Sequence, residues 1–230
     1  MLKINPVVYE HIEKYKASWD QDKIVTIQDL LVVEDADTLN KYLLSVDDSR
    51  WQHSIHPYLD NYYTFDNTVD NQHHIEKGKV TANASYQRGE FSYHFRRFEG
   101  YEQDGITMKT LLTCAQFRNL IQQITGLSVS SIVSCFASRY DAGNWLHVHV
   151  DSGRGSIAFV YNLTKNWKEE YGGNFNLLDD HNWSVVKRVV VPTFNSLTFF
   201  DVSSSGRPHL VQRVNDDVTE SRIAMSGWLD

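Results

Sequence analysis

The sequence predicts a mainly β fold with flanking helices, in which antiparallel strands form a jelly-roll sandwich. From residue 128 onward, short runs rich in Val, Ile, Phe and Thr alternate with Gly, Asn, Asp and Ser. This spacing is typical of successive antiparallel strands, and about seven to eight can be counted. A chain of 230 residues with 41% hydrophobic content can bury one large core. We therefore expect a single domain over residues 1–230, with helical support and a variable region in 1–127 and the jelly-roll core in 128–230.

Three segments before this core have the periodicity of helices. Residues 6–16 carry a proline at the start and apolar side chains three to four positions apart, as a short helix would. Residues 35–44 open with capping residues, and residues 107–124 form a longer helix that Gly126 can terminate. A short strand is expected at residues 24–27. The two later helices should pack against the outside of the sheet.

Residues 51–101 differ in composition from the rest of the chain. This stretch is dense in Tyr, His, Asn and Gln, and it contains His53, His56, His73, His74, Arg88, Arg96 and Arg97. A long polar and aromatic connection on a rigid scaffold commonly carries recognition, so one interpretation is a substrate lid. The other interpretation is a surface excursion with a hairpin. The sequence leaves both open.

The formal net charge of −7, without any tract of Lys or Arg, argues against a general nucleic-acid binder. Binding to phosphate backbones depends on positive charge, which this chain does not concentrate. The same charge is compatible with an acidic enzyme that acts on a basic protein. The sequence does not reveal the oligomeric state.

The cysteine content and the N-terminus bear on the cellular setting. Cys114 and Cys135 lie in predominantly apolar sequence, which suits buried free thiols better than a disulfide scaffold. No basic segment followed by an apolar run stands at the N-terminus, and no stretch approaches the roughly 20 apolar residues of a membrane span. We expect a soluble, cytoplasmic protein without a membrane partner.

His149, Asp151 and His209 are candidate metal ligands. Residues i and i+2 of a strand project from the same face, so His149 and Asp151 can bind one ion together. His209 can supply a second imidazole from another strand. Two histidines and one carboxylate leave open coordination positions, and they are the ligand set of non-haem Fe(II) oxygenases. Because a His-x-Asp pair is common by chance, the prediction depends on the sequence around it.

Further features accompany this motif in order along the chain. They are the segments 140–143, 158–163, 172–173, 196–200 and 222–228. At these positions, between residues 130 and 229, the chain resembles the Fe(II)- and 2-oxoglutarate-dependent dioxygenases of the prolyl 4-hydroxylase-like group. The resemblance implies a double-stranded β-helix, which is a cupin-like jelly roll. It also implies Fe(II), 2-oxoglutarate and O₂, with succinate and CO₂ as coproducts and ascorbate as an agent that keeps the iron reduced.

The resemblance assigns a cation to the far carboxylate of 2-oxoglutarate. Arg222 lies on the strand predicted after His209, where the family keeps a Lys or Arg. Its planar guanidinium suits bidentate binding of a carboxylate. Arg222 is therefore the predicted cosubstrate ligand.

Two positions depart from the family pattern. Many relatives carry a tyrosine where this chain has Asn162, and Tyr161 is displaced by one residue, which points it to the opposite face of a strand. Either Asn162 binds the cosubstrate carboxylate, or Tyr140 reaches it from a neighbouring strand, and we favour Tyr140. The second departure is Ala224, where some related enzymes carry a serine that shares the carboxylate.

Candidate substrate residues are His147, Arg96 and Arg97. His147 alternates with His149 and should face the same side, at the rim of the pocket. Arg96 and Arg97 can hold a substrate carboxylate, or they can be solvated surface charges. The resemblance implies hydroxylation of an unactivated C–H bond of an amino-acid side chain, on a prolyl residue of a peptide or protein or on a free amino acid. Because Asp151 keeps a carboxylate where halogenating relatives have a small residue, hydroxylation is expected.

Two functions of other classes remain open. One is a non-catalytic binding module that has kept the architecture, against which the intact ligand set counts. The other is a cupin-like metal enzyme that needs no cosubstrate. That enzyme would have more histidine ligands and no special role for Arg222, so dependence on 2-oxoglutarate separates the two.

Overall fold

Within the described residues, the fold is built around one sheet of twelve strands. The structure is a computed structural model that describes residues 2–57, 63–99, 114–203 and 207–230. The strands are β1 (Ile24–Ile27), β2 (Gln52–His56), β3 (Tyr63–Phe65), β4 (Tyr93–Phe98), β5 (Ile132–Tyr140), β6 (Trp145–His149), β7 (Ile157–Asn162), β8 (Phe175–Leu178), β9 (Val186–Val190), β10 (Ser196–Asp201), β11 (His209–Val211) and β12 (Arg222–Leu229). Their order in space is β1-β10-β7-β12-β5-β4-β6-β11-β8-β9, with β2 on β4 and β3 on β2.

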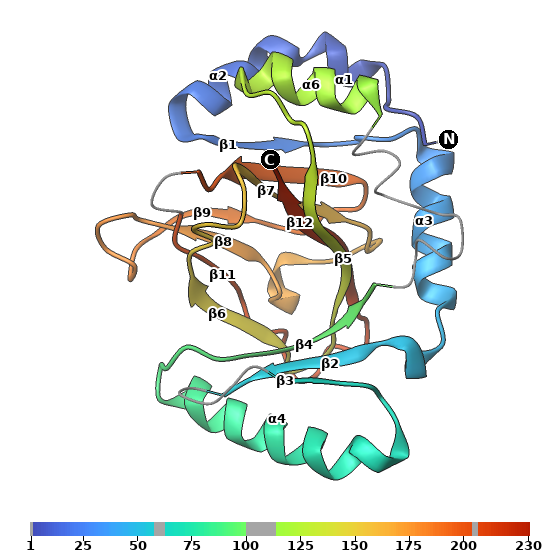
Figure 1. Cartoon of the computed structure of the whole chain (residues 1–230), viewed down its shortest axis with the longest axis vertical. Helices are drawn as coiled ribbons and strands as arrows, with labels where there is room; N and C mark the ends of the chain where they lie inside the picture. The colour runs from blue at the N-terminus through green and yellow to red at the C-terminus, as the bar shows by residue number, and fades with distance from the viewer. Residues whose placement is uncertain (1, 58–62, 100–113, 204–206) are drawn as a thin grey trace.

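The sheet curls, so that its two halves enclose an interior (Figure 1). β4 pairs with both β5 and β6, and it therefore connects the half that ends in β1 to the half that ends in β9. The named strand pairs are antiparallel throughout. Eight strands, β5 to β12, follow residue 128, which agrees with the predicted strand number. The predicted double-stranded β-helix is confirmed.

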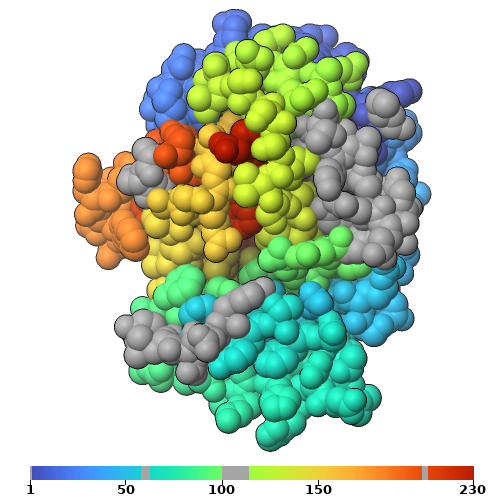
Figure 2. Space-filling model, viewed as in Figure 1, coloured from blue at the N-terminus to red at the C-terminus, as the bar shows by residue number. Residues whose placement is uncertain are grey.

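Helices cover the outside of the curled sheet. They are α1 (Val7–Glu10), α2 (Ile12–Asp22), α3 (Val33–Ser45), α4 (Gln72–Gln87) and α6 (Ala115–Thr125), with short 3₁₀ turns η1 (Asp48–Arg50), η2 (Val69–Asn71) and η4 (Glu169–Tyr171). α1, α2 and α6 lie beyond β1, while α4 lies at the opposite end of the molecule, next to β2 and β3 (Figures 1 and 2). Among the residues that the structure describes, no helix is long and apolar enough to span a bilayer.

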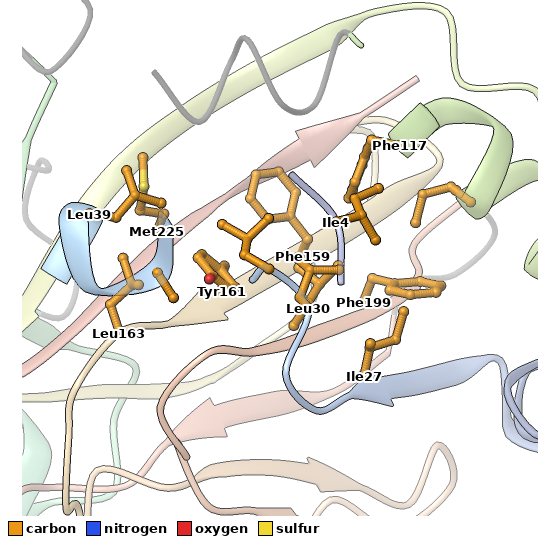
Figure 3. Packing of buried hydrophobic residues seen from close by; sticks show 14 of the residues in the cluster. Ile4, Ile27, Leu30, Leu39, Phe117, Phe159, Tyr161, Leu163, Phe199 and Met225 are labelled. Atoms are coloured by element: carbon orange, nitrogen blue, oxygen red, sulfur yellow. The ribbon is translucent and has the colours of Figure 1, made fainter. Parts of the chain in front are cut away.

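One large apolar cluster fixes these helices to the sheet. In α6, Phe117, Leu120, Ile121 and Ile124 recur at helical spacing, and all four are buried. Figure 3 shows Phe117 gathered in this cluster with Leu39 of α3, Phe159 of β7 and Phe199 of β10. Burying one such side chain stabilises the fold by about 1.5–3 kcal/mol. The prediction that the helices pack against the outside of the sheet is confirmed.

The helix boundaries differ in part from those predicted. The segment 6–16 is two helices that meet at His11, and the second runs on to Asp22. The helix predicted for 35–44 begins two residues earlier, at Val33. Of the helix predicted for 107–124, residues 107–113 lie outside the described part of the chain, and Ala115–Thr125 is helical.

Both ends of α6 have recognisable caps. Gly126 has φ +75° and its N–H donates to the carbonyl of Gln122, so it terminates the helix as predicted. At the N-terminus, the Sγ of Cys114 accepts a hydrogen bond from the Phe117 N–H at 3.4 Å. Neither Cys114 nor Cys135 forms a disulfide, but each side chain is only partly buried, so the expectation of buried thiols is wrong.

The described residues between 51 and 99 belong to the sheet and its covering helix, so they are neither a lid over the sheet nor a surface excursion. They include the expected hairpin, β2 and β3, and they also include β4, which is inserted between β5 and β6. The 16-residue helix α4 was not predicted. Its buried residues are Ile75, Ala82 and Ser85, and this small apolar face gives little periodic signal.

A pair of buried histidines joins β2 to β4. The Asn144 Nδ2 donates to His94 Nδ1 at 3.1 Å, so His94 carries its proton on Nε2 and donates to His53 Nδ1, also at 3.1 Å. Burial lowers the pKa of His53 to about 4 and that of His94 to about 3, and the neighbouring positive charges act in the same direction. Both imidazoles are therefore neutral in the folded protein.

This pair should make stability depend on pH. A histidine whose pKa is lower in the folded than in the unfolded chain stabilises the fold above pH 6.5, and this contribution is lost as the pH falls towards 4. We expect His53→Gln to reduce the slope of unfolding free energy against pH in that window, by up to about 1.4 kcal/mol per pH unit. Urea denaturation across pH 4–7 measures the slope. The exposed His181→Gln is the control, and an unchanged slope in His53→Gln would contradict the assignment.

Candidate metal centre and its pocket

His149, Asp151 and His209 come together at one point, as predicted. His149 ends β6 and His209 begins β11, and the two residues are partners in the β6–β11 ladder. The Nε2 atoms of His149 and His209 lie 3.5 Å from Asp151 Oδ1 and Oδ2, respectively. One potential ligand atom from each residue lies within 4.8 Å of the other two. This spacing suits a single metal ion bound by two imidazoles and a carboxylate.

Backbone carbonyls fix both imidazoles in the form that binds metal. His149 Nδ1 donates to the carbonyl of His147 at 3.0 Å, and His209 Nδ1 donates to that of Arg207 at 2.7 Å. A carbonyl only accepts, so each Nδ1 carries the proton and each Nε2 keeps its lone pair. Such partners commonly orient the histidine ligands of metal sites. Both lone pairs therefore face Asp151.

The protonation states of Asp151 and His209 also suit a cation. Burial alone would raise the pKa of Asp151, but its contacts with His149 and His209 outweigh this effect and lower it to about 2. Burial lowers the pKa of His209 to about 3. At neutral pH, Asp151 is a carboxylate and His209 is a neutral imidazole.

The expectation that His147 faces the same side as His149 is wrong, because the ladder shifts register between them. His209 pairs with His149, but Val211, two residues on, pairs with Leu146, three residues back. The additional residue on β6 is a bulge, which reverses the alternation of side chains. Leu146 and His149 consequently line the same cavity, whereas His147 lines a different groove, beside Tyr86.

The metal ligands line a cavity of about 480 Å³ inside the curled sheet. Its walls come from both halves of the sheet and are largely aromatic, with Phe136, Phe175, Phe200 and Trp228 among them. Arg222 lines the same cavity. The candidate metal ligands and the predicted cosubstrate ligand thus line one cavity.

Arg222 is a buried cation without a countercharge. Its side chain is only 2% exposed, and no carboxylate among the described residues forms an ion pair with it. Its Nη2 donates to Asn162 Oδ1 at 3.3 Å, and its Nε is buried without a hydrogen-bond partner. Burial lowers the pKa of this guanidinium. An unpaired buried charge is costly, so the site is suited to an anionic ligand.

Tyr140 and Asn162 approach Arg222 in different ways. Tyr140 lines the cavity, and the Arg222 guanidinium carbon lies 5.1 Å from the centre of its ring. Burial raises the pKa of the Tyr140 hydroxyl, although the charge of Arg222 opposes this. Asn162 does not line the cavity, and its amide binds Ser196 and Arg222. The geometry favours Tyr140 as a ligand-binding residue and gives Asn162 the task of holding Arg222.

Two positions that departed from the family pattern also have structural explanations. Tyr161 points away from Asn162 into the main apolar cluster, where its hydroxyl donates to Asn195 Oδ1 at 2.6 Å. Ala224 is paired across the ladder with Ser138, and Ser138 lines the cavity. A hydroxyl is therefore available next to the position where Ala224 lacks one.

Gly173 lies closely against Arg222, and Gly172 lies closely against the backbone of Arg213. A Cβ on Gly173 would lie 3.3 Å from Arg222 Cδ and 3.2 Å from Trp167, and the residue has φ +64°. A Cβ on Gly172 would lie 2.2 Å from the carbonyl oxygen of Arg213. Neither position accepts a side chain without displacing the backbone or the arginine.

An ionic cluster pins the strand ends that carry Tyr140 and Arg222. These two residues are the terminal pair of the β5–β12 ladder. Next to them, Asp141 Oδ1 accepts hydrogen bonds from Ser221 Oγ at 2.5 Å and from Arg139 Nε at 2.9 Å. Burial would raise the pKa of Asp141, but its hydrogen bonds and the adjacent arginines hold it below the usual value. A ladder end, which would otherwise fray, is thereby fixed.

Arg96 and Arg97 have different environments because neighbouring residues of a strand face opposite sides. Arg96 belongs to the ionic cluster, where it binds Asp48 and Asp141, and it does not line the cavity. Its predicted role in substrate binding is therefore not supported. Arg97 does line the cavity. The sequence provided a signal for this, since Tyr93, Phe95 and Arg97 alternate along β4 and all three line the cavity.

Arg154 was not identified from the sequence. It lines the cavity, and its guanidinium lies over the ring of Trp228, 5.0 Å from the ring centre. It stands in a glycine-containing turn after Asp151, where no periodic pattern assigns a direction to a side chain. Only the fold brings it to the cavity.

Comparison with known proteins agrees with this fold and site. Residues 135–230 match the 2OG-Fe(II) oxygenase superfamily. This match covers the C-terminal part of the chain and agrees with the resemblance of its motifs to the 2-oxoglutarate-dependent dioxygenases. This match contains the three candidate metal ligands and Arg222.

Among curated proteins, the chain is 31% identical over 116 residues to prolyl 3-hydroxylase OGFOD1 of Xenopus laevis, covering 49% of this chain and 22% of that protein. It is 26% identical over 132 residues to prolyl 3,4-dihydroxylase OGFOD1 of Ostreococcus tauri, covering 54% and 26%. The chain therefore spans only a minor part of these relatives.

Two solved structures share the fold over nearly the whole chain. The prolyl-4-hydroxylase of Pseudomonas putida has a TM-score of 0.60 and 14% identity, covering 95% of this chain and 97% of that one. A prolyl hydroxylase of Trichoplax adhaerens, in complex with a peptide fragment of the oxygen degradation domain of hypoxia inducible factor, has a TM-score of 0.58 and 16% identity, covering 98% and 93%. At these identities the likeness bears on the fold alone.

The geometry predicts which histidine variants lose metal. We expect the purified protein to bind one equivalent of Co(II), used as an air-stable divalent probe of the candidate metal site, and both His209→Ala and Asp151→Ala to lose this binding. His147→Ala should retain the affinity of the unchanged protein, because the bulge turns that residue away. Calorimetric titration measures the affinity. A loss in His147→Ala as large as in His209→Ala would contradict the described register.

Proposed function

We propose that this chain is an Fe(II)- and 2-oxoglutarate-dependent hydroxylase that acts on an amino-acid side chain, most naturally a prolyl residue of a peptide or protein. The observation that carries this proposal is the unpaired, buried guanidinium of Arg222 in the same cavity as His149, Asp151 and His209. A metal site that uses no cosubstrate would have no reason to bury this cation. The same observation disfavours a cupin-like enzyme of that kind and a non-catalytic module.

Each residue has a distinct task in this proposal. His149, Asp151 and His209 hold Fe(II), and Arg222 with Tyr140 holds the far carboxylate of 2-oxoglutarate. When bound, the iron and its cosubstrate would supply the electrons that activate O₂ for hydroxylation of the substrate. Arg222 is buried beneath largely aromatic and aliphatic cavity walls, and this low-dielectric setting strengthens its electrostatic contacts. Ascorbate would keep the iron reduced.

The substrate class is proposed from the relatives. Both curated proteins carry names of prolyl hydroxylases, and the Trichoplax structure contains a peptide. A free amino acid is the alternative, since Arg97 at the cavity could hold its carboxylate. Succinate and CO₂ would be the coproducts, with the cytoplasm as the location and no nucleic acid or membrane as partner.

The role of Arg222 can be tested through cosubstrate binding. Hydrogen bonds to charged groups contribute about 1.5–3 kcal/mol each, so we expect Arg222→Ala to weaken 2-oxoglutarate binding by about 10- to 150-fold. Anaerobic titration of the Fe(II)-loaded protein, followed by its visible charge-transfer band, measures the affinity. Arg118→Ala, on the exposed face of α6, is the matched control. Unchanged affinity in Arg222→Ala would refute the assigned role.

The reaction can be tested by the mass of its product. With Fe(II), 2-oxoglutarate, O₂ and ascorbate, we expect a proline-containing peptide to gain the mass of one oxygen atom, with one succinate formed for each oxygen inserted. His209→Ala should form neither product. Mass spectrometry and succinate quantification report both. If free amino acids gain oxygen and peptides do not, the substrate is a free amino acid rather than a peptide. Succinate formation by the His209 variant would overturn the proposed site.

A further inference from the structure

Two arginines and two aromatic rings form a row along one wall of the cavity. The Arg97 guanidinium lies 4.0 Å from the ring centre of Phe136, the rings of Phe136 and Trp228 are 6.1 Å apart, and the Arg154 guanidinium lies 5.0 Å from the ring centre of Trp228. All four residues line the cavity that holds the candidate metal ligands. We call these four residues the arginine–aromatic row.

The two guanidiniums lie over aromatic rings and keep N–H groups for a ligand. A cation–π contact uses the charge of a guanidinium and does not consume its N–H donors. Arg97 is held on Phe136 with Nη2 bound to Glu99 Oε1 at 2.5 Å, while its buried Nε has no partner. Within the described residues, Arg154 has no ion-pair partner, and its guanidinium lies over the ring of Trp228. Donors on both arginines are therefore available.

The charges of the cavity are unbalanced. Asp151 is the only carboxylate among the described residues that line it, whereas Arg97, Arg154 and Arg222 are all cations. A divalent iron and Arg222 would be neutralised by Asp151 and the dianionic cosubstrate. Arg97 and Arg154 then remain, with Glu99 as a half-exposed partner of Arg97. The cavity is thus positive in a chain whose net charge is −7.

We propose that the arginine–aromatic row selects a substrate that carries a carboxylate close to the carbon to be hydroxylated. This inference rests on the proposed function and names the substrate class of that same site. The carboxylate belongs either to an acidic residue beside the target in a peptide or to a free amino acid. In both cases it binds the edges of Arg154 and Arg97 and exchanges with Glu99, because an exposed ion pair contributes little to stability.

Capped peptides with one central proline provide the test for a peptide carboxylate. Three peptides differ only in the residues flanking that proline, which are Asp, Asn or Lys. The Asp and Asn peptides form the first carboxylate–amide pair. L-Proline and L-prolinamide form the second pair, which tests the carboxylate of a free amino acid. Binding is measured by calorimetry with protein loaded with Mn(II) and 2-oxoglutarate, so that it does not depend on turnover. We expect the carboxylate member of at least one pair to bind about tenfold more tightly than its amide counterpart, and less so at high salt.

Variants connect this preference to the row. Arg154→Gln and Arg97→Gln should each reduce the preference for the carboxylate, and Arg154→Glu should shift it towards the Lys peptide. Arg50→Gln is the matched control, because Arg50 is also exposed and stacked on a ring, 4.8 Å from the centre of Phe98, but it does not line the cavity. The control should keep the full preference.

Failure of this inference is distinguishable from failure of the proposed function. Oxidation of 2-oxoglutarate in the absence of substrate tests the proposed function. The preference for the carboxylate in the binding experiments tests the role of the arginine–aromatic row. Equal binding of the members of both pairs, tighter binding of the Lys peptide to the unchanged protein, or no binding by any probe would overturn the inference. A preference that survives in both Arg154→Gln and Arg97→Gln would overturn the assignment to the row.

Discussion

The burial of the Arg222 guanidinium is the constraint on which the site depends. A cation that is 2% exposed and has no carboxylate partner among the described residues costs free energy of folding, and the surrounding fold must compensate for it. Asn162 binds its Nη2, Tyr140 lies beside it, and Gly173 leaves space for its methylene groups. These contacts hold the charge towards the cavity rather than neutralise it. An anion bound in the cavity would offset this free-energy cost by pairing with the guanidinium.

The positions of the other site residues depend on the ends and irregularities of strands. Tyr140 and Arg222 are the last pair of their ladder, and the cluster around Asp141 prevents that end from opening. His149 stands just after a bulge in β6, which selects it rather than His147 for the cavity. A regular ladder would have turned both histidines the same way. One additional residue in β6 therefore decides which histidine joins the candidate metal site.

Residues outside the family match complete the cavity. The match begins at residue 135, yet β4 contributes Tyr93, Phe95 and Arg97 to the wall. β4 lies between β5 and β6, so its alternate side chains face the metal ligands directly. The candidate metal ligands and Arg222 are thus separate in sequence from β4, which supplies another part of the cavity wall. Under the proposed function, the first part would hold the iron and the cosubstrate, and β4 would face the substrate.

The sequence by itself predicted the strand-rich core, the three candidate metal ligands and Arg222. The strands follow from short-range alternation, and the candidate site residues follow from the order of the motifs along the chain. It also marked the alternation in β4, although the pattern was obscured by the mixture of aromatic and basic residues. Only the tertiary structure decided that His147 faces away, that Arg96 belongs to an ionic cluster, and that Arg154 reaches the cavity. A bulge, a cross-strand ion pair and a turn all depend on partners distant in the chain, and no local periodicity records where those partners will be.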